Sequence, residues 1–293
     1  MFINVDAVHR TEIGLIKSLQ LFRNPLLDSV MIFLSFLDTL PFYLLFVAAV
    51  WYLYSQKCGL NLAYLLVISL LVNSDAKEFF ALPRPFVLAP DVGLERVPDF
   101  GFPSGAAQTT VALFGFVALA VQKRWLWILS MIGVLLISLS RVYLGIHFPS
   151  DIIGGWAIGA AVLGIYCAVV PFFESVFLGQ PKMTLLYLSV IATLFGTFLC
   201  LNEKLIEVVL FGFGVSVGYI AAPNEAAVGT YPKRVLKLVV ALSGIVLLQE
   251  GAALAFRSAA SWPILASLPG AASSFLSGFW LAFGPSVVVR RNI

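Results

Sequence analysis

The chain has 293 residues, of which 60% are hydrophobic and only 11% are charged, and its formal net charge is +3. Soluble domains are about 45–50% apolar and about 25% charged, so this composition argues against a soluble enzyme, a disordered protein and a nucleic-acid-binding protein. None of the three cysteines belongs to a C-x-x-C pair, which argues against a disulfide framework or a zinc site.

The N-terminal segment differs from the rest of the chain. Residues 5–23 interleave apolar side chains with charged ones such as Arg10, Glu12 and Lys17. This pattern predicts an amphipathic helix that lies on the membrane surface, and residues 1–25 are assigned to it. The segment lacks the basic start, apolar centre and cleavage site of a signal peptide.

Long apolar stretches follow, and each is long enough to cross a bilayer as a helix of about 20 residues. Segment 26–55 is interrupted at Thr39-Leu40-Pro41. Its second part, 40–55, is predicted to span, whereas 26–38 carries two aspartates and is either a span or a re-entrant or interfacial segment. The later predicted spans are 60–81, 104–121, 125–143, 151–173, 183–201, 205–222, 235–256 and 263–289. The predicted fold is therefore an all-α transmembrane bundle with about nine or ten spans.

Charge placement gives this bundle an orientation. The side opposite loop 82–103 carries Lys57, Lys123, Arg124, Lys182, Lys233, Arg234, Arg290 and Arg291. The side of that loop carries only Arg84, Arg96, Lys204 and Arg257. Because cytoplasmic loops are rich in lysine and arginine, loop 82–103 is predicted to face the periplasm of a bacterial inner membrane, or an organelle lumen.

Polar residues gather at three places on this outer side. Lys77 and Arg84 flank the end of span 60–81, Ser104 and Gly105 open span 104–121 after a proline, and Arg141 ends span 125–143. Three cations and the free N–H groups of a helix N-terminus suit a phosphate group. Taken singly, each cation has a simpler explanation, since lysine and arginine at helix ends often only reach toward the interface.

A histidine and an aspartate complete the outer cluster. His147 and Asp151 are four residues apart, so one helical turn places them on the same face. A carboxylate bonded to one ring nitrogen leaves the other nitrogen free to attack phosphorus. Taken alone, His147 is more simply interpreted as an interfacial or packing residue, and Asp151 as an ordinary helix N-cap. Together with the cations they predict phosphoryl transfer through a phosphohistidine.

The three segments resemble the signature of the type 2 phosphatidic acid phosphatase superfamily. The first motif, Lys77 through Arg84-Pro85, and the third, Ser140-Arg141 through His147 to Asp151, are complete. The resemblance covers roughly residues 26–173. It implies that His147 is the nucleophile and Asp151 its orienting partner. It also implies that Lys77, Arg84, Ser104, Gly105 and Arg141 bind the phosphate, without a metal or other cofactor.

The second motif departs from the family at one position. The chain reads Pro103-Ser104-Gly105-Ala106, where the family has a histidine at the last position that protonates the leaving alkoxide. A positioned acid contributes about 10²–10⁴-fold, so turnover is predicted to be impaired. Either Ala106 was introduced to stall the enzyme with substrate bound, or the chain is a natural relative with reduced or altered activity. The intact remainder of the site favours the first explanation.

The resemblance implies a membrane lipid phosphate or pyrophosphate as substrate and assigns residues 26–175 to a catalytic bundle. Residues 176–293 add further spans of unknown role, including Glu250 in an apolar stretch, for which a structural role is favoured. A lipid phosphotransferase that uses the same site, or a lipid transporter or flippase, is the alternative. The sequence indicates no nucleic-acid partner and does not determine an oligomeric state.

Overall fold

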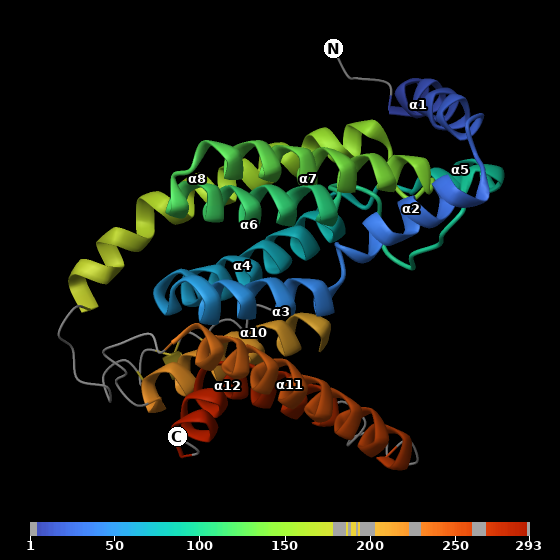
Figure 1. Ribbon diagram of the computed structural model, residues 1–293. Helices are drawn as coiled ribbons and strands as arrows, with labels where there is room; N and C mark the ends of the chain where they lie inside the picture. The colour runs from blue at the N-terminus through green and yellow to red at the C-terminus, as the bar shows by residue number, and fades with distance from the viewer. Residues whose placement is uncertain are drawn as a thin grey trace. The chain divides into compact units, whose positions relative to one another are not determined.

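A computed structural model describes residues 5–177, 203–222, 230–259 and 268–291, with a few isolated residues between 186 and 193 (Figure 1). The elements of this part of the chain are all helical, which confirms the predicted fold class. They are α1 (Val5–Gln20), α2 (Pro25–Phe36), α3 (Leu40–Ala49), η1 (Val50–Tyr54), α4 (Gln56–Phe80), α5 (Pro85–Leu88), η2 (Pro90–Val92), α6 (Gly105–Val121), α7 (Arg124–Tyr143), α8 (Pro149–Phe177), α10 (Glu203–Ala221), α11 (Tyr231–Ala259) and α12 (Leu268–Arg291).

Five helical stretches within the described ranges are long and apolar enough to cross a membrane. They are Gln56–Leu88, Arg124–Tyr143, Pro149–Phe172, Tyr231–Ala255 and Leu268–Val289. The pair α2 and α3–η1 makes a sixth if it counts as one span, and α6 and Leu205–Ala221 are shorter apolar helices. The predicted span 183–201 lies largely outside the described residues, so the count of nine or ten stays a prediction.

The break inside segment 26–55 is confirmed. Asn24 caps α2 by accepting a hydrogen bond from the Leu27 N–H (2.9 Å), and Pro25 occupies the first turn, where its missing N–H costs nothing. The helix ends at Phe36, and the pair of α2 and α3–η1 is bent by 62° at the break. The next helix, α3, begins at Leu40-Pro41, where proline is again tolerated in a first helical turn.

The chain divides into two compact units, each described here by itself. One contains residues 68–168 and the described part of 1–43, and the other contains residues 44–67 and the described part of 169–293. In the second unit α12 packs against α10 and α11, and the Trp280 indole donates to the Val240 carbonyl (3.0 Å). All the site residues predicted from the sequence lie in the first unit.

In the first unit, α6, α7 and α8 contact one another in pairs. Ser130 of α7 donates to the Phe114 carbonyl of α6 (3.2 Å), and the Trp156 indole of α8 donates to the Ser138 hydroxyl of α7 (3.0 Å). The rings of Phe116 and Tyr166 meet edge to face across α6 and α8. These three helices carry the second and third motifs at their ends.

Glycine on α8 allows that helix to approach the backbone of α6. A Cβ added at Gly159 would lie 2.4 Å from the Gln108 carbonyl oxygen, and one at Gly155 would lie 2.6 Å from the Ser104 carbonyl oxygen. The close approach brings the Ser104 N–H to the carbonyl oxygen of Asp151 (3.0 Å). Close glycine packing of α8 therefore connects the second motif to the third.

We expect Gly159→Ala to destabilise the protein, because the new methyl meets backbone that cannot move aside. Overpacking of this kind costs about 1–3 kcal/mol, which exceeds the gain of about 1 kcal/mol in helix propensity. The matched control is Gly164→Ala on the same helix, where an added Cβ has nothing within 4 Å. Thermal unfolding in one detergent should show a lower Tm for the first variant and an unchanged or higher Tm for the second. Equal Tm values would contradict the packing account.

Candidate active site

His147 lies in the short link between α7 and α8, and a tight turn at Gly145 positions it. Gly145 has φ +70°, and an added Cβ there would lie 2.0 Å from the Val92 carbonyl oxygen. Only glycine adopts this conformation without penalty. The Leu94 N–H donates to the Leu144 carbonyl (3.0 Å), which ties the preceding loop to the turn. The imidazole is thereby buried, with 5% of the residue exposed.

The contacts of the two ring nitrogens select a tautomer of His147. Nε2 lies 3.2 Å from Nη1 of Arg84, and Nδ1 lies 3.3 Å from Oδ2 of Asp151. A guanidinium only donates hydrogen bonds, so Nε2 accepts and the ring proton is on Nδ1, facing the carboxylate. The same Asp151 oxygen accepts the Phe148 N–H (2.9 Å), which fixes its position. The nitrogen with the lone pair therefore faces a cation.

Lys77 and Arg84 converge on a carboxylate that the sequence analysis did not single out. Nζ of Lys77 lies 2.5 Å from Oδ2 of Asp99, and Nη2 of Arg84 contacts Oδ1 of the same residue. Nε of Arg84 donates to the Asp99 backbone carbonyl (2.8 Å), and Nη1 donates to the Ile146 carbonyl (2.9 Å). The two predicted phosphate ligands are thus adjacent, with an internal anion between them.

Arg141 is held on the side of α2. Its Nη2 lies 3.3 Å from Oδ2 of Asp38 and 2.5 Å from the Ser35 carbonyl oxygen. Its buried Nε has no hydrogen-bond partner among the described residues. Its backbone carbonyl accepts the N–H groups of Ile146 (3.1 Å) and His147 (3.3 Å). Arg141 therefore contacts the loop that carries His147 through its backbone and is paired with a second acid through its side chain.

The N-terminus of α6 is packed against α4 by buried polar side chains. Ser104 caps the helix by accepting the Ala107 N–H (3.4 Å). Asn73 donates to Gln108 Oε1 (3.0 Å), and an added Cβ at Gly105 would lie 2.9 Å from the Asn73 side-chain oxygen. Ala106, where the sequence resemblance predicts that a general acid is missing, is 1% exposed in the first turn. Ser104, Gly105 and Ala106 thus lie at the start of one helix that packs against α4.

Burial and charge set the protonation of the groups in the loops. Burial lowers the pKa of His147 well below 6.5, and the charges of Arg84, Lys77 and Arg141 lower it further. For Asp99, burial alone raises the pKa, but Lys77 and Arg84 outweigh it, so that its pKa is lowered. At neutral pH the imidazole is therefore neutral and the Asp99 carboxylate is ionised.

The N-terminal helix contributes residues that the sequence analysis did not place in the site. Glu12, 7% exposed, accepts hydrogen bonds from the Ser150 N–H (2.7 Å) and hydroxyl (3.0 Å) at the start of α8. The His9 ring stacks on Phe148 with centroids 4.1 Å apart. Nε2 of Gln20 donates to the Val92 and Tyr143 carbonyls (2.9 and 2.8 Å). One face of the N-terminal helix therefore packs on the loop that carries His147 and on the start of α8.

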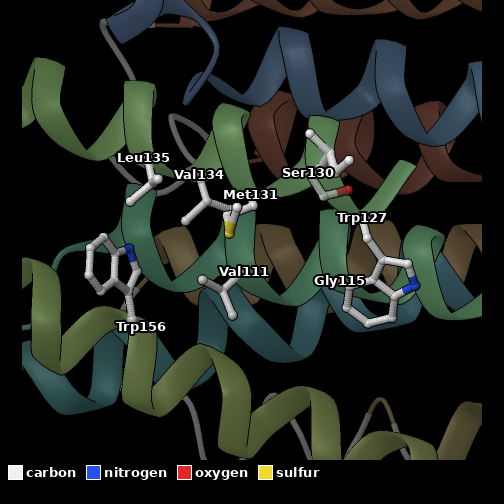
Figure 2. Close-up of a pocket in the computed structure, with 9 residues that line it drawn as sticks. Val111, Gly115, Trp127, Ser130, Met131, Val134, Leu135 and Trp156 are labelled. Carbon is white, nitrogen blue, oxygen red and sulfur yellow. The ribbon is translucent and has the colours of Figure 1, made fainter. Parts of the chain in front are cut away.

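An apolar pocket lies between α6, α7 and α8, and none of the residues of the polar cluster lines it (Figure 2). Its volume is about 470 Å³, and no charged residue lines it. Trp127 and Trp156 stand at its opposite ends. Val111, on its wall, is five residues beyond Ala106, which corresponds to about 8 Å along a helix. Within the described ranges, no group of three or more His, Cys, Asp or Glu side chains is placed to hold a metal ion.

Comparison with known proteins assigns the family. The sequence model of the PAP2 superfamily matches residues 59–174, a range that contains all three motifs. The undecaprenyl-diphosphatase BcrC of Bacillus subtilis is 30% identical over 146 residues, which cover 48% of this chain and 73% of that protein. The chain belongs to the PAP2 superfamily, and it is an integral membrane protein.

Two further similarities are with an archaeal and a bacterial protein. An undecaprenyl-diphosphatase of Sulfolobus acidocaldarius is 37% identical over 108 residues, which cover 36% of this chain and 52% of that protein. The chain thus matches about half the length of this relative. A crystal structure of a transmembrane PAP2-type phosphatidylglycerolphosphate phosphatase from Bacillus subtilis is 26% identical, with 58% of this chain and 89% of that chain covered and a TM-score of 0.49.

The lowered pKa of His147 predicts that its ring stays neutral from pH 8 to below pH 6.5. The chain has only two histidines, so His9→Gln leaves a single imidazole to follow by NMR in detergent micelles. We expect its resonances to stay constant between pH 8 and 6.5. Because the unfolded chain takes up this proton near pH 6.5, stability should also fall as the pH drops below that value. A midpoint at or above pH 6.5 would contradict the burial of His147 among cations.

The contacts of Glu12 predict a loss of stability in Glu12→Ala. Two donors of Ser150 lose a charged acceptor, which costs about 1.5–3 kcal/mol per hydrogen bond to a charged group. The Tm in detergent should fall, whereas the control Lys17→Ala, on the same helix and in an exposed ion pair with Asp91, should leave it nearly unchanged. An equal effect of both variants would show that α1 does not support the loop through Glu12.

Proposed function

We propose that the chain hydrolyses a phosphate or pyrophosphate monoester of a membrane lipid, without a metal, through a phosphohistidine on His147. The observation that carries this proposal is the placement of one imidazole with Nδ1 facing Asp151 and Nε2 facing Arg84. Two of the relatives are named as undecaprenyl-diphosphatases, and these names support a lipid phosphate or pyrophosphate as the substrate class. The apolar pocket between α6, α7 and α8 supports it too, because it offers an apolar chain a surface on the same helices.

The geometry supports a reaction in two displacements. In the first, the Nε2 lone pair forms a bond to phosphorus while the bond from phosphorus to the ester oxygen breaks, and the electron pair leaves on that oxygen. Lys77, Arg84 and the N-terminus of α6 stabilise the charge on the phosphoryl oxygens. In the second, water attacks phosphorus, the phosphorus–nitrogen bond breaks, and the imidazole and inorganic phosphate are released. Asp151 stabilises the positive charge on the ring in both steps.

The first displacement requires a proton for the leaving alkoxide, and Ala106 has no group to supply it. Asp99 does not replace the missing acid, because Lys77 and Arg84 keep its carboxylate ionised. The expected rate on alkyl phosphates is therefore lower by about 10²–10⁴-fold than with a positioned acid. The charge asymmetry of the loops supports a site on the side opposite the cytoplasm, which is the periplasm or an organelle lumen.

We predict that Ala106→His raises phosphate release from alkyl lipid phosphates, such as phosphatidic acid or a polyprenyl pyrophosphate, by about 10²–10⁴-fold. The gain on p-nitrophenyl phosphate should be much smaller, because that leaving group needs little protonation. Phosphate release in detergent is the measurement. The matched control Ala106→Gln fills the same space without an acid and should stay slow. A restored histidine variant that releases no phosphate from any lipid phosphate would contradict the proposed function.

A further inference from the structure

The cations of the candidate site are already paired with acids of the same chain. Lys77 and Arg84 contact Asp99, and Arg141 contacts Asp38. A phosphate that enters the site needs the same N–H donors, because guanidinium groups bind carboxylates and phosphates with the same geometry. Binding at this site is therefore an exchange of one anion for another.

Of the two acids, Asp99 is the one whose carboxylate an incoming phosphate can displace. It lies in the loop before α6, and 45% of its side chain is exposed, against 21% for Asp38. The backbone carbonyls of Asp99 and Ile146 also accept hydrogen bonds from Arg84 (2.8 and 2.9 Å). These two contacts do not involve the Asp99 carboxylate. They therefore hold the Arg84 guanidinium in its position when the carboxylate rotates into solvent.

We propose that Asp99 is a resident anion that weakens the binding of every phosphate ligand, so that phosphate monoesters and pyrophosphates, with their higher charge, still bind whereas the singly charged phosphodiesters of the surrounding bilayer do not. This inference rests on the proposed function, since it assumes that Lys77 and Arg84 bind the substrate phosphate. It adds a reason why a site on helix ends at the bilayer surface is not filled by ordinary phospholipids.

The selectivity follows from charge. Displacing the carboxylate removes the same contacts whichever ligand arrives. A phosphate monoester carries a charge of about −1.5 to −2 at pH 7, and a pyrophosphate carries a larger negative charge. Each therefore interacts more strongly with the two cations than the Asp99 carboxylate, which carries a single charge. A diester carries one charge, the same as the carboxylate, and gains nothing by the exchange. The lowered pKa of Asp99 agrees with a carboxylate that stays charged and competes across the neutral range.

The test compares two small ligands without lipid tails, ethyl phosphate and diethyl phosphate, by isothermal titration calorimetry on the full-length protein in detergent at pH 8. We expect the original chain to bind ethyl phosphate and to bind diethyl phosphate much more weakly. In Asp99→Asn the Kd values of both ligands should fall by a similar factor, about tenfold or more, because neither ligand has to displace a carboxylate, so that diethyl phosphate also binds readily. Asp99→Ser should give the same result with a smaller neutral side chain.

The matched control is Asp91→Asn, which removes the same charge from the same loop. Asp91 pairs with Lys17 at 2.7 Å and contacts none of the three site cations. This variant should keep both Kd values of the original chain, and tighter binding of both ligands here would assign the effect to overall charge and overturn the inference. Unchanged or higher Kd values of both ligands in both Asp99 variants would also overturn it while leaving the phosphate site intact. If the original chain and the variants all fail to bind ethyl phosphate, the proposed function itself fails.

Discussion

The buried guanidinium of Arg84 joins the parts of the candidate site. It is 3% exposed, and a buried cation is stable only when its donors are satisfied. Its partners come from three places: the Asp99 backbone and carboxylate, the Ile146 carbonyl and the imidazole of His147. Because the guanidinium only donates, it forces the His147 proton onto the nitrogen that faces Asp151. One side chain thus fixes the loop, the tautomer and the direction of the lone pair.

Much of the fold could be predicted from the sequence, because its signals are local. The length of an apolar run, a proline in a first turn and an Asn or Ser cap depend on neighbours within a few residues. The predicted spans 104–121 and 125–143 agree with α6 and α7 to within a residue at each end. The break in segment 26–55 covers residues 37–39, and the predicted interruption at Thr39-Leu40-Pro41 overlaps it at Thr39. The structure also brings Lys77, Arg84, His147 and Asp151 together, as their spacing in the motifs led us to expect.

The pairing of acids could not be predicted, because it depends on contacts between distant segments. Asp91, Glu95 and Asp99 look equivalent in the sequence, as three acids in one loop. The fold gives them different partners: Lys17 for Asp91, the Ser35 hydroxyl for Glu95, and the cations of the site for Asp99. The N-terminal helix illustrates the same limit. Its amphipathic pattern predicts one apolar face, but a pattern alone does not distinguish a lipid surface from Phe148 and the start of α8.

The identity of the nucleophile is the claim that the mechanism depends on most, and it is open to direct measurement. The full-length protein is mixed with p-nitrophenyl phosphate, quenched in base, which preserves phosphohistidine, and analysed by mass spectrometry of its peptides. The account predicts one phosphoryl group on His147, released by acid and absent from His147→Asn. Release of p-nitrophenol with the phosphoryl group on another residue, or equal release by His147→Asn, would contradict it.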